Sequence, residues 1–360
     1  MSGFGREIPF FLSNKNLSSR SFPHPPMTGK YMLSLWAVLI ATMMLSGCKE
    51  KELPLSAEEI ARLDSLALHV AVMPVTDCLP LVYAVKSGIT DSMGLDVRLH
   101  HYTAQMDVDT ALLGGRVEVA YSDLIRGLRM MPSLQVKTLM CNTSPMTLVA
   151  LKTNRVKKAH QLKERMVAVS RLSLTDFWCD ALLDSAFMQG DDIYRPQVHD
   201  VQLRTDMLRT GLIDAAMMPS PYASWMIRLG HKAVSVSPAA GPHLAAWLAR
   251  RDVWTDSLRY RQVEQLVEAY QLAVKRLAVP EHDNQWRQLV ATACNVPQEM
   301  ADSMRLLPPQ QPVLPSEDDV KAAARFLERR ERLPIQVKPD SLLLDSAHIP
   351  PSLSALLRNS

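Results

Sequence analysis

Polar side chains stand directly after short apolar runs at several points of this chain. Their hydroxyl, amide, carboxylate and guanidinium groups can hydrogen-bond an anion, an amine or a polar ring. The candidate ligand-binding residues are Thr76, Asp77, Tyr102, Gln105, Ser122, Asp123, Asn142, Thr143, Ser144, Ser170, Arg171, Ser173, Ser220 and Tyr222. The sequence has no nucleophile elbow, no HExxH motif and no phosphate-binding loop. These residues therefore predict reversible binding of a small polar ligand and no enzymatic activity.

Arg171 is the only cation among these candidates. It follows an apolar run at 166–170 and precedes a long amphipathic segment, so in a parallel sheet it stands at the carboxyl edge, where ligands bind. We expect it to contact a charged group of the ligand, and a place on the rim of the protein is the alternative. Ser173 either contacts the ligand or caps the following helix. Asp77 either binds an amine of the ligand or caps a helix.

Three further candidates bear on the nature of the ligand. Tyr102 and Tyr222 either stack on a ring of the ligand or form part of the wall of its site. Asp123 stands at the same expected edge as Asp77, and the two carboxylates would repel an anion or bind an amine. We therefore expect a zwitterion, or a heterocycle that carries both donors and acceptors.

Neither a metal ion nor another cofactor is expected. Four cysteines follow Cys48 in the chain: Cys78, Cys141, Cys179 and Cys294. They form no CxxC pair, which disfavours a zinc or redox motif, and both disulfides and free buried thiols remain open for them. His100 and His101 are adjacent, so on a strand they face opposite sides and cannot bind one metal ion together.

The charges of the chain are almost balanced. Its 360 residues contain 40 Lys and Arg against 37 Asp and Glu, which gives a formal charge of +3, and no block of basic residues occurs. Nucleic acid is therefore not an expected partner. Hydrophobic residues make up 47% of the chain, which is enough for a large core.

Strands and helices alternate along the chain from residue 68 onward. The first half predicts strands at 69–74, 95–102, 117–122, 134–140 and 146–152. The second half predicts strands at 166–170, 197–202, 213–219 and 232–237, then a returning strand at 243–254. Helices are expected between the strands and, after the last one, at 256–278, 283–293, 297–306 and 317–332. This alternation is typical of α/β proteins whose mostly parallel sheets are covered on both faces.

The N-terminal region has the pattern of an export signal. Lys30 precedes an uncharged run at 31–45, which is shorter than the roughly 20 residues of a membrane-spanning helix. The run ends in Leu-Ser-Gly-Cys, and this ending resembles the lipobox of bacterial lipoproteins, in which the cysteine, here Cys48, receives lipid. An ordinary secretory signal with a chance cysteine is the alternative. We expect the signal peptide to occupy 1–47 and translation to begin at Met27.

Two segments share a pattern of glycine, acidic residue, apolar strand and polar loop: residues 114–120 and 211–216. Together with LPLVYAVKSGI at 79–89 and MGLDVRLHHY at 93–102, they resemble the type II periplasmic binding proteins. Within these, the chain is most similar to the receptors for nitrate, sulfonates, taurine and pyrimidine precursors that serve ABC importers. The closing segment FLERRERLPIQVKPDSLLLDSAHI at 326–349 fits the same family.

Two places depart from the family's pattern. Ser220 precedes Pro221 where the family often has an acidic residue, and the loop at 75–78 fits no single ligand class. Both departures bear on the identity of the ligand and leave the expected fold unchanged.

The resemblance implies two doubly wound α/β domains joined by a two-strand hinge, with the ligand in the cleft between them. The first domain would comprise 68–153 and 240–349 and the second 154–239, with a spacer at 48–67 and a tail at 350–360. It also implies a monomer, lipid-anchored on the periplasmic side of a bacterial membrane, that passes its ligand to a permease and its ATPase. Two alternatives remain: an enzyme of the same fold that acts on a small metabolite, and a receptor that feeds a sensor.

Lipid attachment at Cys48 is directly testable. Mass spectrometry of the membrane fraction should find Cys48 at the N-terminus with acyl groups attached, because the lipobox cysteine becomes the first residue of the mature chain. A Cys48→Ala variant should move to the soluble fraction. A wild-type protein that is already soluble, or a variant that fractionates unchanged, would contradict the prediction.

Overall fold

The computed structural model describes residues 56–332, 338–344 and 351. The expected signal peptide, Cys48 and all of the tail except Pro351 lie outside these residues. Within the described part, no helix is long and apolar enough to cross a membrane.

The chain divides into a unit that ends at Ile60 and a second unit that begins at Ala61. The first helix described, α2 (Ala57–Leu66), begins with a capping box, in which the Glu59 N–H donates to Ser56 Oγ (3.1 Å) and the Ser56 N–H donates to Glu59 Oε2 (3.4 Å). Both sheets belong to the second unit.

The first sheet has five strands in the order β2-β1-β3-β9-β4. Their bounds are β1 Leu68–Val72, β2 Val97–His101, β3 Val119–Asp123, β4 Val136–Asn142 and β9 Ala245–Arg250. The returning strand β9 runs antiparallel to both of its neighbours, and the other four strands run in one direction. The carboxyl ends of these four strands therefore lie at one edge of the sheet.

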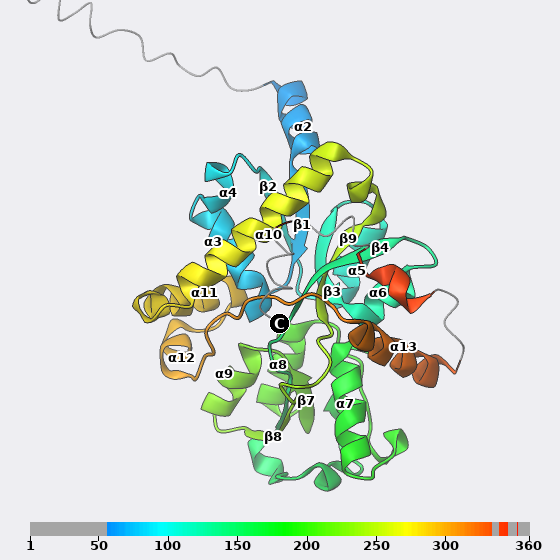
Figure 1. The fold of residues 1–360 in the computed structure, drawn as a ribbon. Coiled ribbons are helices and arrows are strands. Elements are labelled where there is room, and N and C mark those ends of the chain that lie inside the picture. Colours follow the sequence, from blue (N-terminus) through cyan, green and yellow to red (C-terminus); the bar gives the residue numbers. More distant parts are fainter. Residues whose placement is uncertain (1–55, 333–337, 345–350, 352–360) are drawn as a thin grey trace, which may run out of the picture. The chain divides into compact units, whose positions relative to one another are not determined.

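Helices cover both faces of the first sheet (Figure 1). The connection from β1 to β2 runs one way along the sheet and that from β2 to β3 runs the other way. Right-handed crossovers therefore place α3 (Leu79–Lys86) and α5 (Gln105–Leu113) on opposite faces. The short α4 (Ile89–Ser92) and the long α10 (Ser257–Leu277) pack against α3, and α6 (Leu124–Met130) packs against β3 and β4. We call this sheet with α3–α6 and α10 the first lobe.

The second sheet has four strands in the order β6-β7-β5-β8. Their bounds are β5 Thr147–Ala150, β6 Val167–Ala168, β7 Ala215–Met218 and β8 Lys232–Val236. Here β5 is the strand that runs antiparallel to its neighbours. Helices α7 (Leu174–Ser185) and α8 (Val201–Thr210) contact β7, and α9 (Tyr222–Arg228) contacts β5 and β8. We call this sheet with α7–α9 the second lobe.

Two strands expected from the sequence are corrected by the structure. The strand at 146–152 was assigned to the first half, but β5 pairs with β7 and β8, because the chain crosses between the sheets before this strand and not after it. The strand expected at 197–202 is reduced to isolated bridges, one of which joins Gln197 in parallel to Val169. Asp200 caps a helix there by accepting the Leu203 N–H (2.8 Å), so α8 begins inside the apolar run.

Two segments link the lobes at the edge where the strands of the first lobe end. Residues 143–146 lead from β4 to β5, and residues 237–244 lead from β8 back to β9. This pair of connections is the two-strand hinge that belongs to the expected fold class. The limits given above for two separately moving domains stay a prediction.

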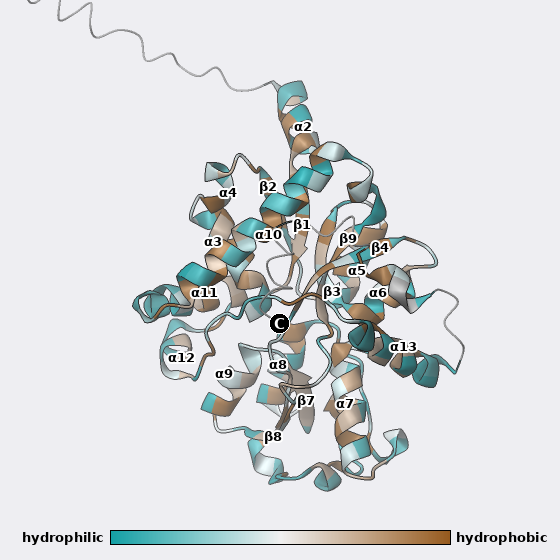
Figure 2. Ribbon diagram, in the orientation of Figure 1, coloured by the Kyte–Doolittle hydropathy of each residue, from teal (hydrophilic) through white to brown (hydrophobic). Residues whose placement is uncertain are grey.

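The helices after α10 contact both lobes. They are α11 (Asp283–Cys294), α12 (Gln298–Ser303) and α13 (Glu317–Glu331). Of these, α11 packs against α3 of the first lobe and α12 against α9 of the second, while α13 packs against α6. Figure 2 shows α13 as largely hydrophilic, and its arginines reach α7 of the second lobe. The C-terminal part of the chain therefore spans the two lobes.

The core of the first lobe closes around Trp247 of β9. This side chain is fully buried, its Nε1 donates to Asn142 Oδ1 (3.1 Å), and its ring meets Tyr121 and Tyr270 edge-on. The four cysteines left open by the sequence are all buried and free: Cys78, Cys141, Cys179 and Cys294.

Aspartates on α7 are neutralised by arginines from two other segments. Asp176 is fully buried, its Oδ1 accepts from Arg195 Nη1 (2.6 Å), and its Oδ2 accepts from Arg330 Nη2 of α13 (3.4 Å). Asp180 also accepts from Arg195 (2.6 Å). Because a buried charge without a partner costs several kcal/mol, each member of this cluster depends on the others.

Removing the central carboxylate should destabilise the fold strongly. Asp176→Ala leaves Arg195 buried with one partner fewer, so we expect the free energy of unfolding to fall by about 3–5 kcal/mol. The matched control is Asp206→Ala, which breaks an exposed pair with Arg209 on α8 and should cost less than about 1 kcal/mol. Urea denaturation followed by circular dichroism measures both, and equal losses would contradict the account.

Candidate functional site

The carboxyl ends of strands from both lobes meet around a small, partly open cavity. Its volume is about 40 Å³, little more than one or two water molecules need. We call it the interlobe cavity. It is lined by Met73, Val75, Gln105, Tyr121, Asp123, Met146, Ser170, Ser173, Leu174, Thr175, His199, Val201, Arg204 and Pro219. A ligand of ordinary size enters this place only if the lobes separate.

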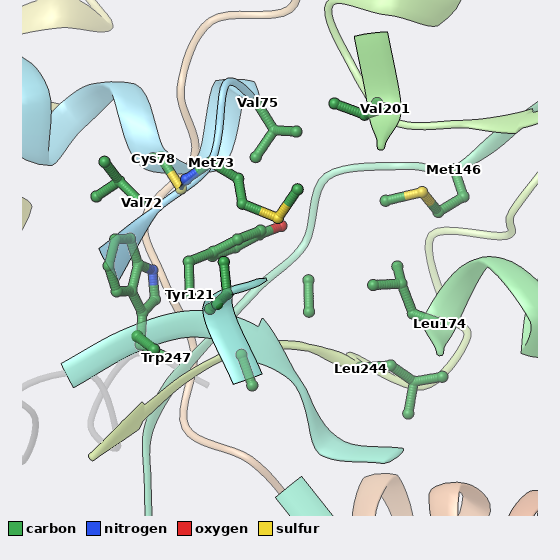
Figure 3. Close-up of a cluster of buried hydrophobic side chains, with 14 of the residues drawn as sticks. Val72, Met73, Val75, Cys78, Tyr121, Met146, Leu174, Val201, Leu244 and Trp247 are labelled. Carbon is green, nitrogen blue, oxygen red and sulfur yellow. Dashed lines mark hydrogen bonds between the residues drawn. The ribbon is translucent and has the colours of Figure 1, made fainter. Parts of the chain in front are cut away.

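Apolar side chains from both lobes form one wall of the cavity. Figure 3 shows Met73 and Tyr121 of the first lobe close together, with Met146 of a crossing segment and Leu174 and Val201 of the second lobe around them. All of these side chains are buried. The contact between the lobes therefore removes apolar surface from water, which stabilises the packing of one lobe on the other.

Asp123 is the polar residue that joins the two lobes. It ends β3 and caps α6, because its Oδ1 accepts the Arg126 N–H (2.9 Å). Its Oδ2 accepts the Leu174 N–H at the first turn of α7 in the second lobe (3.2 Å). The side chain has no exposure, and this burial raises the pKa of Asp123 to about 6, although Arg126 opposes the rise.

Arg126 is a buried cation of the first lobe that reaches the second. Its Nη1 forms an ion pair with Asp109, and its Nη2 donates to Ser170 Oγ (3.1 Å) and to the Arg171 carbonyl (3.2 Å). Its Nε is buried without a hydrogen-bond partner among the described residues. The guanidinium therefore links the two lobes by hydrogen bonds, and its Nε–H has no acceptor among the described residues.

Arg204 on α8 is a second buried cation, and it lines the cavity directly. Its exposed fraction is 3%, its Nη1 donates to the Val198 carbonyl (2.7 Å), and its Nε has no partner. Within the described part of the chain it makes no ion pair, and burial lowers its pKa to about 10. A buried, unpaired guanidinium is costly, so this place favours an anion or an acceptor group.

His199 and Ser170 complete the polar side of the cavity. His199 Nδ1 lies 2.9 Å from Ser170 Oγ, and the backbone carbonyl of His199 accepts the Gln105 N–H (3.5 Å). Burial lowers the pKa of His199, and Arg126 and Arg204 lower it further. The imidazole is thus held neutral at physiological pH and acts as a hydrogen-bonding group.

A second polar site lies beside the first, around Asp77. This carboxylate accepts the Tyr121 hydroxyl (2.8 Å) and the Ser144 hydroxyl, and burial raises its pKa. It lines a cavity of about 30 Å³ together with Asn142, Tyr270 and residues 307–310. Because no arginine or lysine pairs with it in the described part of the chain, Asp77 favours a donor group of a ligand.

The expected site residues separate into three groups. The interlobe cavity brings together Gln105, Asp123, Ser170 and Ser173. The Asp77 cavity brings together Thr76, Asp77, Asn142, Thr143, Ser144 and Ser220. Neither cavity is lined by Tyr102, Ser122, Arg171 or Tyr222.

Ser122 and Tyr222 have structural partners. Ser122 Oγ accepts from Gln105 Nε2 (3.1 Å), and the Tyr222 hydroxyl donates to the Cys294 carbonyl (3.0 Å). Ser173, for which two roles were open, does cap α7 through its hydroxyl, which accepts the Thr175 N–H (3.2 Å), and it also lines the cavity.

The side chain of Arg171 lines neither cavity, and its contact with a ligand stays a prediction. The side chain is exposed, and only its carbonyl contacts the interlobe region. The chain turns at Leu172, which has a positive φ of 51°, and the side chain before the turn points outward. Arg126 and Arg204 supply the buried positive charge instead.

Three polar residues at or beside the interlobe cavity were not predicted from the sequence: Arg126, His199 and Arg204. Arg126 stands three residues after Asp123, a spacing that places a helical side chain beside its cap, so the capping pattern was the signal that pointed to it. His199 lies inside the segment expected as a strand at 197–202 and Arg204 two residues after it, and the start of α8 at Val201 was not predicted.

In the part of the chain that the structure describes, no three His, Cys, Asp or Glu side chains are grouped so that they could hold a metal ion. Cys78, directly before α3, is fully buried, and burial together with Asp77 raises the pKa of its thiol well above the ordinary value. A thiol in this setting has little thiolate character.

Comparisons with known proteins agree on the fold. Residues 75–236 match the sequence model of the NMT1/THI5-like family. The alkanesulfonate-binding protein SsuA from Xanthomonas axonopodis pv. citri, solved with bound MOPS, is 15% identical with a TM-score of 0.67, covering 78% of this chain and 98% of that one. The periplasmic nitrate-binding protein NrtA from Synechocystis PCC 6803 is 13% identical with a TM-score of 0.66, covering 81% and 89%.

An enzyme shares the same fold. The desulfurization enzyme DSZB is 15% identical with a TM-score of 0.55, covering 81% of this chain and 99% of that one. None of the curated proteins matches the chain in sequence. The resemblance read from the sequence is confirmed at the level of the fold, which is that of the type II periplasmic binding proteins.

The burial of Asp123 predicts a specific dependence of stability on pH. Between about pH 4 and 6 the folded protein holds a proton on Asp123 that the unfolded chain has released, so the free energy of unfolding falls as pH rises through this window. The shift from 3.8 to about 6 corresponds to roughly 3 kcal/mol.

Asp123→Asn removes this titration and keeps an acceptor for the Arg126 N–H. Urea denaturation at pH 4, 5, 6 and 7 should show the stability of the wild type falling relative to the variant, by roughly 3 kcal/mol in total. Circular dichroism checks that the variant is folded. A difference between the two proteins that stays constant with pH would contradict the prediction.

Proposed function

We propose that this chain, which has the fold of the type II periplasmic binding proteins, is the substrate-binding component of an ABC importer. One observation carries the proposal. Strand ends of two lobes surround a cavity that holds a buried arginine, Arg204, which makes no ion pair among the described residues and whose Nε–H has no acceptor there. An importer receptor needs a site that both lobes build and that closure buries, because this couples capture of the ligand to a change of shape.

The proposed ligand is small and has polar groups of both kinds. Arg204 and Ser170 offer donors in the interlobe cavity, and Asp77 offers a buried acceptor in the neighbouring cavity. The apolar wall of Met73 and Tyr121 suits a short carbon body between such groups. A zwitterion, or a heterocycle with donors and acceptors, combines these features.

The proposed setting is the periplasmic side of a bacterial membrane. Lipid on Cys48 would tether the protein, and the spacer that follows would let the two lobes reach a permease with its ATPase. The protein would act as a monomer, since one chain supplies both walls of the cavity. A receptor that feeds a sensor would use the same site, and it differs only in the partner that recognises the closed form.

Catalysis is the second candidate, and the fold shared with DSZB is the reason to consider it. Cys78, directly before α3, is poorly suited to act as a nucleophile. Its thiol is fully buried, and its raised pKa keeps it protonated. Its Sγ accepts the Met73 N–H (3.4 Å), so the group serves as a structural acceptor.

A thermal-shift screen tests the proposed function. The purified protein is heated with a panel of small amino acids, sulfonates, carboxylates and pyrimidines, and a true ligand at 100 times its Kd should add about 2.7 kcal/mol of stability. Arg204→Gln should lose the response, while Arg209→Gln, an exposed arginine of the same helix, should keep it.

The fate of the ligand separates binding from catalysis. Mass spectrometry should recover the stabilising compound unchanged after prolonged incubation with the protein. Conversion of the compound would favour the enzyme, and a panel without any stabilising compound would count against a receptor for these classes.

A further inference from the structure

The place where α7 would receive a negative group is already taken by a side chain of the first lobe. The N-terminus of this twelve-residue helix offers backbone N–H groups and partial positive charge. Asp123 Oδ2 accepts the Leu174 N–H there (3.2 Å), and the carboxylate is fully buried in the wall of the interlobe cavity.

A second, independent feature points to a negative group at this place. Arg204 lines the same cavity, is 3% exposed, and has a buried Nε without a partner. It belongs to α8, whereas Asp123 belongs to β3, so the two residues approach the cavity from different lobes. The cavity thus contains a buried donor, Arg204 Nε, that no acceptor among the described residues uses.

We propose that Asp123 is a built-in competitor of the ligand: a compact anionic group of the ligand takes its place at the N-terminus of α7, and Asp123 takes up a proton when this happens. The inference rests on the proposed function, because it concerns the same cavity. It assigns to the ligand one anionic group, such as a carboxylate or a sulfonate, and it makes capture of that group dependent on pH.

The charges around Asp123 explain why a proton must accompany the anion. Arg126 of α6 and Arg204 of α8 are cations at this region. Asp109 of α5 pairs with Arg126, and Asp200, the N-cap of α8, acts electrostatically on Arg204. Burial and the two arginines lower the pKa of His199, which stands just before α8, and the Tyr121 hydroxyl donates to Asp77. A bound anion beside an ionised Asp123 would place two negative charges together in a buried site.

Burial has already brought Asp123 close to the proton-bound state. Its pKa is about 6 without any ligand, so an additional negative charge needs to shift it only a little further to protonate it at neutral pH. The protonated carboxyl group then becomes a donor to the anion and no longer repels it. The proton comes from solvent, and no other reactant is required.

The test measures anion binding by the full-length protein at pH 5.5, 6.5, 7.5 and 8.5. The probes are acetate, methanesulfonate and sulfate, three compact anions that stay ionised over this range, compared with chloride at equal ionic strength. Thermal stabilisation gives the apparent Kd of each. In the wild type we expect the affinity for at least one probe to fall by up to about tenfold per pH unit above pH 6.5, because one proton is taken up with the anion.

Two variants assign the effect to its residue. Asp123→Asn should bind the same anion with an affinity that no longer depends on pH and that exceeds the wild-type affinity at pH 8.5. His199→Gln should keep the slope of the wild type, which separates Asp123 from the other titrating group at the cavity. If Asp123→Asn does not fold, the comparison of wild type with His199→Gln decides alone.

Several results would overturn the proposal. They are stabilisation by no probe beyond chloride, affinity that is flat with pH in the wild type, a slope that persists in Asp123→Asn, and a slope that vanishes in His199→Gln. If uncharged compounds stabilise the protein while no anion does, this inference fails and the proposed receptor function stands.

Discussion

The carboxylate of Asp123 is the contact on which the closed arrangement of the two lobes depends. It ends a strand of one lobe and accepts a backbone N–H at the first turn of a helix in the other, with no exposure to water. A buried carboxylate costs several kcal/mol unless a cation and hydrogen bonds surround it. Arg126 and the two helix starts supply these partners together only while the lobes touch. Opening the cleft would return the charge to water, and the hydration of the carboxylate would favour the open form. The buried apolar side chains of both lobes, among them Met73 and Leu174, favour the closed form (Figure 3).

The proposed receptor function needs such a balance. A ligand shifts the equilibrium between open and closed forms only by the difference in its affinity for the two. The cavity of about 40 Å³ has a buried donor without an acceptor, Arg204 Nε, so a ligand that accepts from it gains most when the lobes close around it. The C-terminal part of the chain adds a second link, because Arg330 of α13 reaches Asp176 on the second lobe while α13 itself packs against α6 of the first.

The sequence revealed the architecture more readily than the site. Alternating apolar runs and helix starts depend on local periodicity, so β1 to β4, β9 and the long helices were predictable to within a few residues. The sheet to which β5 belongs could not be predicted, because the four-residue segment that crosses between the lobes looks like any other loop in the sequence. Polar residues directly after strands, such as Asp123 and Ser170, were found from the rule for parallel sheets. Arg126 and Arg204 lie within helices, where a charged residue is normally solvated, and only the closure of the second lobe buries them.

The central claim is that the interlobe cavity opens and closes around a ligand. The most direct measurement is the distance between spin labels on exposed positions of the two lobes, Asp91→Cys in α4 and Asp206→Cys in α8, by pulsed electron resonance; the four internal cysteines are buried and stay unlabelled. The account predicts a broad distribution that includes long distances without ligand, and a single short distance at saturation. One and the same narrow distance with and without the stabilising compound would contradict it.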